Sequence, residues 1–112
     1  MEQLKGQGAL LRIFISESDR LGTKPLYVAI MEMLKKEKIA GATVLRGICG
    51  FGAKSHLRHA HILALSQELP LVIEAVDRRE RIDSILPEID SMVKDGLVTL
   101  EKVEVIRYEP QD

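Results

Sequence analysis

Side chains that bind anions gather in one short segment, directly after a glycine motif. The motif is Gly50-Phe51-Gly52, and the basic and histidine residues after it are Lys54, His56, Arg58, His59 and His61. No Asp or Glu occurs from residue 38 to residue 67, although 17 of the 112 residues are acidic. Glycine permits close approach of the backbone to a ligand, and local positive charge attracts anions. The pattern indicates a mobile anion-binding loop. A solvated hairpin loop is the alternative, because so short a motif is unspecific.

An anion site needs donors from more than one segment of the chain. The loop and its base supply Arg46, Lys54 and Arg58. Arg78 and Arg79 lie at the predicted start of a helix, where free N–H groups and the helix dipole also favour anions. Because the loop joins two strands of one sheet, we expect both groups of residues near the same end of that sheet.

Metal binding and nucleophilic catalysis have weaker support in the same segment. The histidines His56, His59 and His61 cannot all converge from one regular element, since one pair shares a strand face and another a helix face. No carboxylate lies near them, so the sequence predicts no metal site. Cys49 within an apolar strand is typical of a small buried side chain, and Ser55 lacks the context of a catalytic serine.

Composition limits the classes of protein to consider. A chain of 112 residues with 46% hydrophobic residues fits a single domain over residues 1–112. The net charge of −1 argues against non-specific nucleic-acid binding, and no apolar run approaches the ~20 residues of a membrane span. The single cysteine, Cys49, excludes an internal disulfide and favours a reducing compartment. We therefore expect a cytoplasmic protein that does not insert directly into a membrane.

The strands that position the loop follow from the hydrophobic pattern. Residues 9–16 alternate as a strand, with Leu11, Ile13 and Ile15 on one face and Leu10, Arg12 and Phe14 on the other. Since both faces carry apolar side chains, we expect another subunit to cover the second face. Residues 42–49 form the second predicted strand and residues 71–76 the third. Residues 60–69 fit either a hairpin or a helical turn.

The first predicted helix lies between the first two strands. Residues 17–22 form a polar connection, and Thr23 is expected to be the N-cap, with Pro25 in the first turn. Apolar residues then recur at helical spacing, and Gly41 is expected to end the helix.

The second predicted helix follows the third strand. Asp77 and Glu80 are spaced as a capping box, although Arg81 also has a local ion-pair partner in either of them. The helical period continues through Pro87, which predicts one kinked helix that ends at Gly96.

The resulting order of elements, βαββαβ, is that of the ferredoxin-like fold. The last strand lies within residues 98–108. In this α+β class, two helices cover one face of a four-stranded antiparallel sheet, and the other face is left for solvent or a partner. The sequence therefore predicts one sheet with its helices on one side and a basic loop between its second and third strands.

Several stretches, which together cover nearly the whole chain, resemble the PII-like family catalogued as domain of unknown function 190. They are Glu17-Ser18-Asp19-Arg20, Lys24-Pro25-Leu26-Tyr27, Gly41-Ala42-Thr43-Val44-Leu45-Arg46-Gly47-Ile48 with Gly50-Phe51-Gly52, Leu69-Pro70 with Val72-Ile73-Glu74, and Val103-Glu104-Val105-Ile106-Arg107-Tyr108. That family is related to the nitrogen-regulatory PII signalling proteins, to which the likeness is looser and rests on the glycine motif and the fold.

The resemblance implies a homotrimer that binds an adenine nucleotide (ATP, ADP or AMP) in the clefts between subunits. It also implies that the loop of residues 53–60 is flexible and is presented to an unknown protein partner. The resemblance also implies that Arg107 is the counterpart of a basic residue on the last strand of PII sites. With the anion-binding residues above, the predicted nucleotide-binding set is Arg46, Gly50, Phe51, Gly52, Lys54, Arg58, Arg78, Arg79 and Arg107. The chain departs from the PII pattern at one place, because PII proteins carry a glycine-rich phosphate loop between the third strand and the second helix. Residues 77–81 contain no glycine, so arginines and the helix N-terminus would hold the phosphates instead.

The predicted function is signalling and not catalysis, because no general base or metal-binding carboxylate pair accompanies the glycines. Two alternatives use the same fold. A metal-responsive trimer of the copper-tolerance type would use His56, His59 or His61. A small phosphate-handling enzyme, as in the acylphosphatases, would hold phosphate with arginines. The fold by itself does not choose among these functions.

Overall fold

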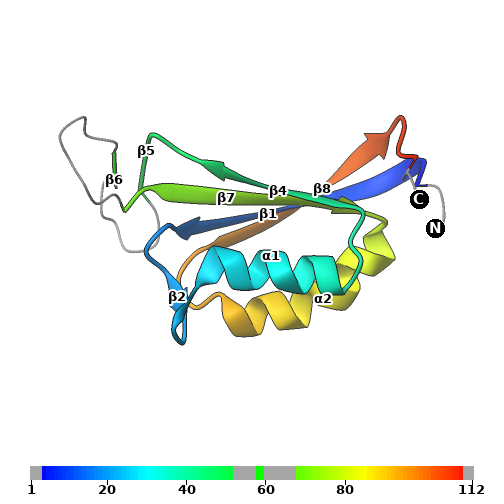
Figure 1. Ribbon diagram of the computed structural model, residues 1–112. Helices are drawn as coiled ribbons and strands as arrows, with labels where there is room; N and C mark the ends of the chain where they lie inside the picture. The colour runs from blue at the N-terminus through cyan, green and yellow to red at the C-terminus, as the bar shows by residue number, and fades with distance from the viewer. Residues whose placement is uncertain (1–3, 52–57, 60–67, 110–112) are drawn as a thin grey trace.

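Four long strands form one antiparallel sheet, and two helices lie on one of its faces (Figure 1). The computed structural model describes residues 4–51, 58–59 and 68–109. The sheet has the order β4-β7-β1-β8, with bounds β1 (Gly6–Ser16), β4 (Gly41–Arg46), β7 (Pro70–Asp77) and β8 (Leu97–Val105). The helices are α1 (Leu26–Lys36) and α2 (Arg79–Met92). This arrangement confirms the predicted α+β, ferredoxin-like fold. Neither helix is long and apolar enough to cross a membrane.

The core lies between the helices and the face of the sheet that carries Leu11, Ile13 and Ile15. Leu11 and Ile13 of β1 are fully buried, and Ile13 is paired with the equally buried Ile73 of β7. Apolar side chains at helical spacing complete the core, and those on the helices are Leu26, Ile30, Met33, Leu34, Ile82, Ile85 and Ile89. The alternation along β1 is thus explained by burial against α1 and α2 on one side only.

The opposite face of the sheet carries an apolar row and a charged row. Register places Leu45, Val72, Phe14 and Leu97 side by side across all four strands. In the neighbouring row, Arg12 forms ion pairs with Glu74 at 2.9 Å and with Glu101. Hydrogen bonds to Glu74 and Glu101 raise the pKa of the Arg12 guanidinium. The prediction that both faces of β1 carry apolar residues is confirmed.

The ends of α1 differ from the expected caps. Pro25 occupies the N-cap position without a side-chain hydrogen bond, so the prediction for Thr23 is wrong. At the other end, Lys38 has φ of 59°, and the Ile39 N–H donates to the Leu34 carbonyl at 3.1 Å. The Lys38 N–H donates to the Lys35 carbonyl at 3.0 Å. These two bonds form a Schellman motif, in which a left-handed residue ends the helix. Lys38 therefore takes the role expected for Gly41, which instead begins β4.

The start of α2 also corrects a prediction. Asp77 is the last residue of β7, and Arg78, which makes no side-chain capping bond, is the N-cap. The capping box is therefore wrong, whereas the local pairing of Arg81 with Asp77 is confirmed at 3.0 Å. Helix α2 continues through Pro87 as predicted but ends at Met92, before Gly96.

Short strands replace two segments that were predicted differently. The polar connection after β1 contains a small hairpin of β2 (Arg20–Leu21) and β3 (Lys24–Pro25). The second predicted strand breaks after β4, and β5 (Cys49–Gly50) pairs with β6 (Arg58–His59) instead of joining the main sheet. The remainder of the basic loop, residues 52–57 and 60–67, lies outside the described residues, and so do the predictions made for it.

Candidate functional site at the base of the loop

The base of the loop packs closely on the first residue of β7. The Gly47 N–H donates to the Pro70 carbonyl at 2.8 Å. A Cβ atom added to Gly47 would lie 3.0 Å from the Pro70 ring, and one added to Gly50 would lie 3.1 Å from it. A side chain at either position would require the proline ring to shift by a few tenths of an ångström, so glycine permits this close approach of the loop base to β7. In Figure 1, β5 and β6 lie at one end of the sheet, beyond the helices.

Two apolar side chains are exposed at this base. Ile48 is 78% exposed and Phe51 is 76% exposed, on either side of the β5 strand. Cys49 is also exposed, so the expectation of a buried cysteine is wrong. It pairs with His59 of β6 instead of lying in the core strand. An aromatic ring and an aliphatic side chain in solvent provide a surface for an apolar or planar group of a ligand.

Arg46, the last residue of β4, is positioned at this same base by an ion pair. Its Nη2 atom donates to Oε1 of Glu17 at 2.8 Å. Glu17 follows β1, and its N–H donates to the Leu69 carbonyl at 2.8 Å. The side chains of Arg46 and Glu17 are 51% and 29% exposed, so the pair is open to solvent. Arg46 is thus accessible to an anion, with a carboxylate already beside it.

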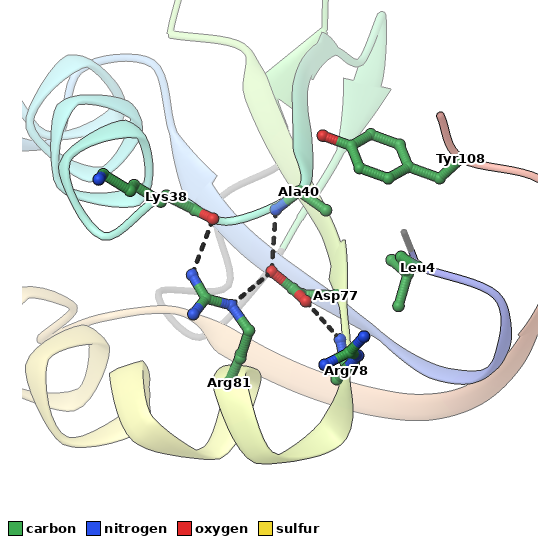
Figure 2. Close-up of a pocket in the computed structure, with 7 residues that line it drawn as sticks. All are labelled: Leu4, Lys38, Ala40, Asp77, Arg78, Arg81 and Tyr108. Carbon is green, nitrogen blue, oxygen red and sulfur yellow. Dashed lines mark hydrogen bonds and ion pairs between the residues drawn. The ribbon is translucent and has the colours of Figure 1, made fainter. Parts of the chain in front are cut away.

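Three of the predicted arginines, Arg78, Arg79 and Arg107, lie at the opposite end of the sheet, near a shallow pocket. The pocket has a volume of about 190 Å³ and is lined by Leu4, Lys38, Ala40, Asp77, Arg78, Arg81 and Tyr108 (Figure 2). Arg79 forms an ion pair with Asp83 at 2.8 Å, and Arg107 forms one with Glu109 at 3.0 Å. Of this group, Arg78 lines the pocket directly.

A hydrogen-bond network closes the floor of this pocket. The Asp77 carboxylate accepts bonds from the N–H groups of Ala40 at 2.9 Å and Arg78 at 2.6 Å. Arg81 donates to the same carboxylate and to the carbonyl of Lys38 (Figure 2). It also donates to the carbonyl of Glu37 at 2.7 Å. Sequence reasoning missed Ala40, whose contribution is a backbone group. The available signal was the antiparallel pairing of the strands predicted at residues 42–49 and 71–76. In such a pair, the chain just before the first strand lies beside the chain just after the second.

The structure separates the two basic groups that were expected to meet. Strands β4 and β7 are antiparallel, with Gly41 opposite Val76 and Arg46 opposite Leu71. The seven residue-to-residue steps from Leu71 to Arg78 span about 23 Å at ~3.3 Å per residue. The expectation that Arg46 and Arg78 lie near the same end of the sheet in one chain is therefore wrong.

The remaining predicted residues divide between the described and the undescribed parts of the chain. Arg58 lies in β6, opposite Gly50, which brings it to the loop base. Gly52, Lys54, His56 and His61 lie outside the described residues. Within residues 4–51, 58–59 and 68–109, no group of three His, Cys, Asp or Glu side chains is arranged to hold a metal ion.

Comparison with known proteins identifies the family of this chain. A family model named DUF190, described as an uncharacterised family, matches residues 8–105. The chain belongs to this family. The match confirms the resemblance derived from the sequence motifs. Among other members, a UPF0166 protein of Aquifex aeolicus is 42% identical over 87% of this chain and 91% of its own. A UPF0166 protein of Methanocaldococcus jannaschii is 38% identical over 89% of this chain and 93% of its own.

The fold of this DUF190 chain is shared with PII-like proteins. A structure of CPII, a nitrogen regulatory PII-like protein from Thiomonas intermedia, bound to ADP, AMP and bicarbonate, superposes with a TM-score of 0.65. The two chains are 17% identical, and the match covers 90% of each. A second CPII structure, bound to ADP and bicarbonate, gives a TM-score of 0.58 at 16% identity and the same coverage. At this identity the likeness defines the fold, which is PII-like.

Proposed function

We propose that this protein is a PII-like regulatory protein that binds an adenine nucleotide between the subunits of a homotrimer. The proposal is supported by the fold that it shares with CPII, whose structures contain ADP and AMP. The observation that carries it is the loop base, where Gly47 and Gly50 pack on Pro70 and leave Ile48 and Phe51 in solvent. A nucleotide base needs such an apolar surface, and its phosphates need a nearby cation such as Arg46.

The separation of the basic groups supports a site between subunits. One nucleotide cannot reach both Arg46 and Arg78 in one chain, because the length of β7 lies between them. In a closed ring with head-to-tail contacts, two different patches of neighbouring subunits meet, and we propose that these are the loop base of one subunit and the opposite sheet end of the next. Arg78, Arg79 and Arg107 would then contribute to the site of the neighbouring subunit.

The face of the sheet opposite the helices supplies a surface for this assembly. Its apolar row, Leu45, Val72, Phe14 and Leu97, crosses all four strands, and Leu45 and Leu97 are 49% and 58% exposed. Contiguous apolar surface of this kind is typical of contacts between subunits. Nucleotide binding at the loop base would change the presentation of the basic loop to a protein partner, and the two affinities would then be coupled reciprocally. The function would be regulation and not turnover of the nucleotide.

Titration calorimetry with ATP, ADP and AMP tests the proposal. We expect at least one of them to bind, and Arg46→Ala to weaken it roughly tenfold or more, since a hydrogen bond to a charged group contributes ~1.5–3 kcal/mol. Arg20→Ala, which changes an exposed arginine of the small hairpin, is the matched control. Absence of binding by all three nucleotides, with tight binding of a divalent metal lost in His56→Ala or His59→Ala, would favour the metal-responsive alternative.

Mixed assemblies test whether the site lies between subunits. Arg46→Ala and Arg78→Ala subunits are expected to bind weakly when each is assembled alone. After unfolding and refolding together in equal amounts, an Arg46 from one subunit meets an Arg78 from another in about a quarter of the clefts. Recovery of about a quarter of the wild-type binding capacity is expected. If both arginines served one site within one subunit, mixing would recover nothing.

A further inference from the structure

We propose that Glu17 is an internal competitor at the nucleotide site, whose carboxylate holds Arg46 until a phosphate replaces it. The inference rests on the proposed nucleotide site and adds the residue that sets its affinity for phosphate. A carboxylate and a phosphate present similar anionic oxygens to a guanidinium, so one can substitute for the other.

The backbone holds both members of this ion pair in place. Consecutive carbonyls at the start of β7 accept the two relevant N–H groups, with Leu69 bonded to Glu17 and Pro70 bonded to Gly47, each at 2.8 Å. Glu17 is therefore anchored after β1 and Arg46 is anchored just before Gly47, on either side of β7. The side chains meet because the main chain is fixed, and a ligand that displaced one of them would not have to move the sheet.

Comparison with the other arginines shows why this pair is suited to exchange. Asp77 in the Arg81 pair has a side chain only 6% exposed and accepts two backbone bonds as well. Arg12 is held by two carboxylates at once. By contrast, the structure gives Arg46 one carboxylate among the described residues, and both partners are partly exposed. An ion pair open to solvent contributes little stability, so an incoming phosphate can replace the carboxylate at low cost.

The charge of Glu17 then acts against the ligand. A phosphate at Arg46 must either displace the Glu17 carboxylate or lie close to a like charge, and both lower its affinity. Neutralising Glu17 should therefore tighten phosphate binding. A ligand without phosphate should not respond.

Calorimetry with ADP and with adenosine on the Glu17→Gln variant tests the inference. We expect ADP to bind about two- to fivefold more tightly, the range for loss of one partly exposed ion pair, and adenosine to be unaffected. Glu32→Gln removes the carboxylate of the exposed Lys24–Glu32 pair and is the matched control, with unchanged affinity for ADP. Glu17→Ser, checked for folding by circular dichroism, should reproduce the effect.

A double-mutant cycle with Arg46→Ala separates competition from simple repulsion. If Glu17 acts by occupying Arg46, Glu17→Gln has no effect on ADP affinity in the Arg46→Ala background. A gain of the same size in that background would overturn the competition. If wild type binds ADP and Glu17→Gln does not bind it more tightly, this inference fails and the nucleotide site stands. If neither protein binds ADP, both the site and the inference fail.

Discussion

Asp77, the last residue of β7, accepts a hydrogen bond at 2.9 Å from the backbone N–H of Ala40, which lies 37 residues earlier in the chain. The same carboxylate binds Arg81 in the first turn of α2, so one side chain joins the start of β4, the end of β7 and a helix. Asp77 is 4% exposed. The end of the sheet away from the loop is therefore fixed by a buried charge with several donors.

Replacing Asp77 with asparagine should destabilise the fold. The neutral side chain weakens the bonds from Ala40 and Arg81, and a hydrogen bond to a charged group contributes ~1.5–3 kcal/mol. We expect the free energy of unfolding in urea to fall by about this amount. Asp83→Asn is the control, because its exposed ion pair with Arg79 contributes less than ~1 kcal/mol. If the two variants lowered the free energy of unfolding equally, burial of Asp77 would not explain its contribution to stability.

Gly96→Ala should destabilise the protein through a steric clash. An added Cβ atom would lie 2.6 Å from the Phe14 carbonyl oxygen, which belongs to β1 and cannot rotate away. Forcing extra volume into a packed site costs about 1–3 kcal/mol. Gly41→Ala is the control, since nothing lies within 4 Å of its added Cβ atom. Thermal unfolding should give a clearly lower midpoint for the first variant only.

Lys38→Gly should stabilise the end of α1. Lys38 has a left-handed backbone, which is unfavourable for a residue with a Cβ atom and is readily adopted by glycine. The gain is reduced by the greater freedom of glycine in the unfolded chain, so we expect about 0.5–1 kcal/mol. Lys36→Gly, in the last turn of the helix, should instead lower stability by a similar amount. A loss of stability in Lys38→Gly would show that its side chain has a packing role.

Phe14→Glu should prevent assembly if the face opposite the helices forms the contact between subunits. The new charge would lie in the middle of the apolar row, between Val72 and Leu97. Light scattering should give about three times the chain mass for wild type and the chain mass for the variant. Leu21→Glu, an exposed apolar position in the β2–β3 hairpin, should leave the assembly intact. A wild-type monomer would exclude both the assembly and a site between subunits.

Local patterns in the sequence determined the elements and the side of the sheet that is buried. The alternation of Leu11, Ile13 and Ile15 predicted the inner face of β1, because the period of a strand is two. The helical spacing predicted α2 through Pro87, since burial of Ile82, Ile85 and Ile89 follows the period of a helix. The strand period, the helix period and the glycine motif of the loop are all recognisable from residues that lie close together in the sequence.

Only the tertiary structure decided which functional residues meet. The antiparallel direction of β4 and β7 sends Arg46 and Arg78 to opposite ends of the sheet, a relationship that no local spacing encodes. The role of Asp77 likewise depends on the N–H of Ala40, which any residue type other than proline could supply. The Glu17–Arg46 pair arises because β7 lies between β1 and β4, and the carbonyls of Leu69 and Pro70 at its entry bind the segments that follow those two strands. Contacts between distant segments follow strand order and direction, and those are set by packing of the whole core.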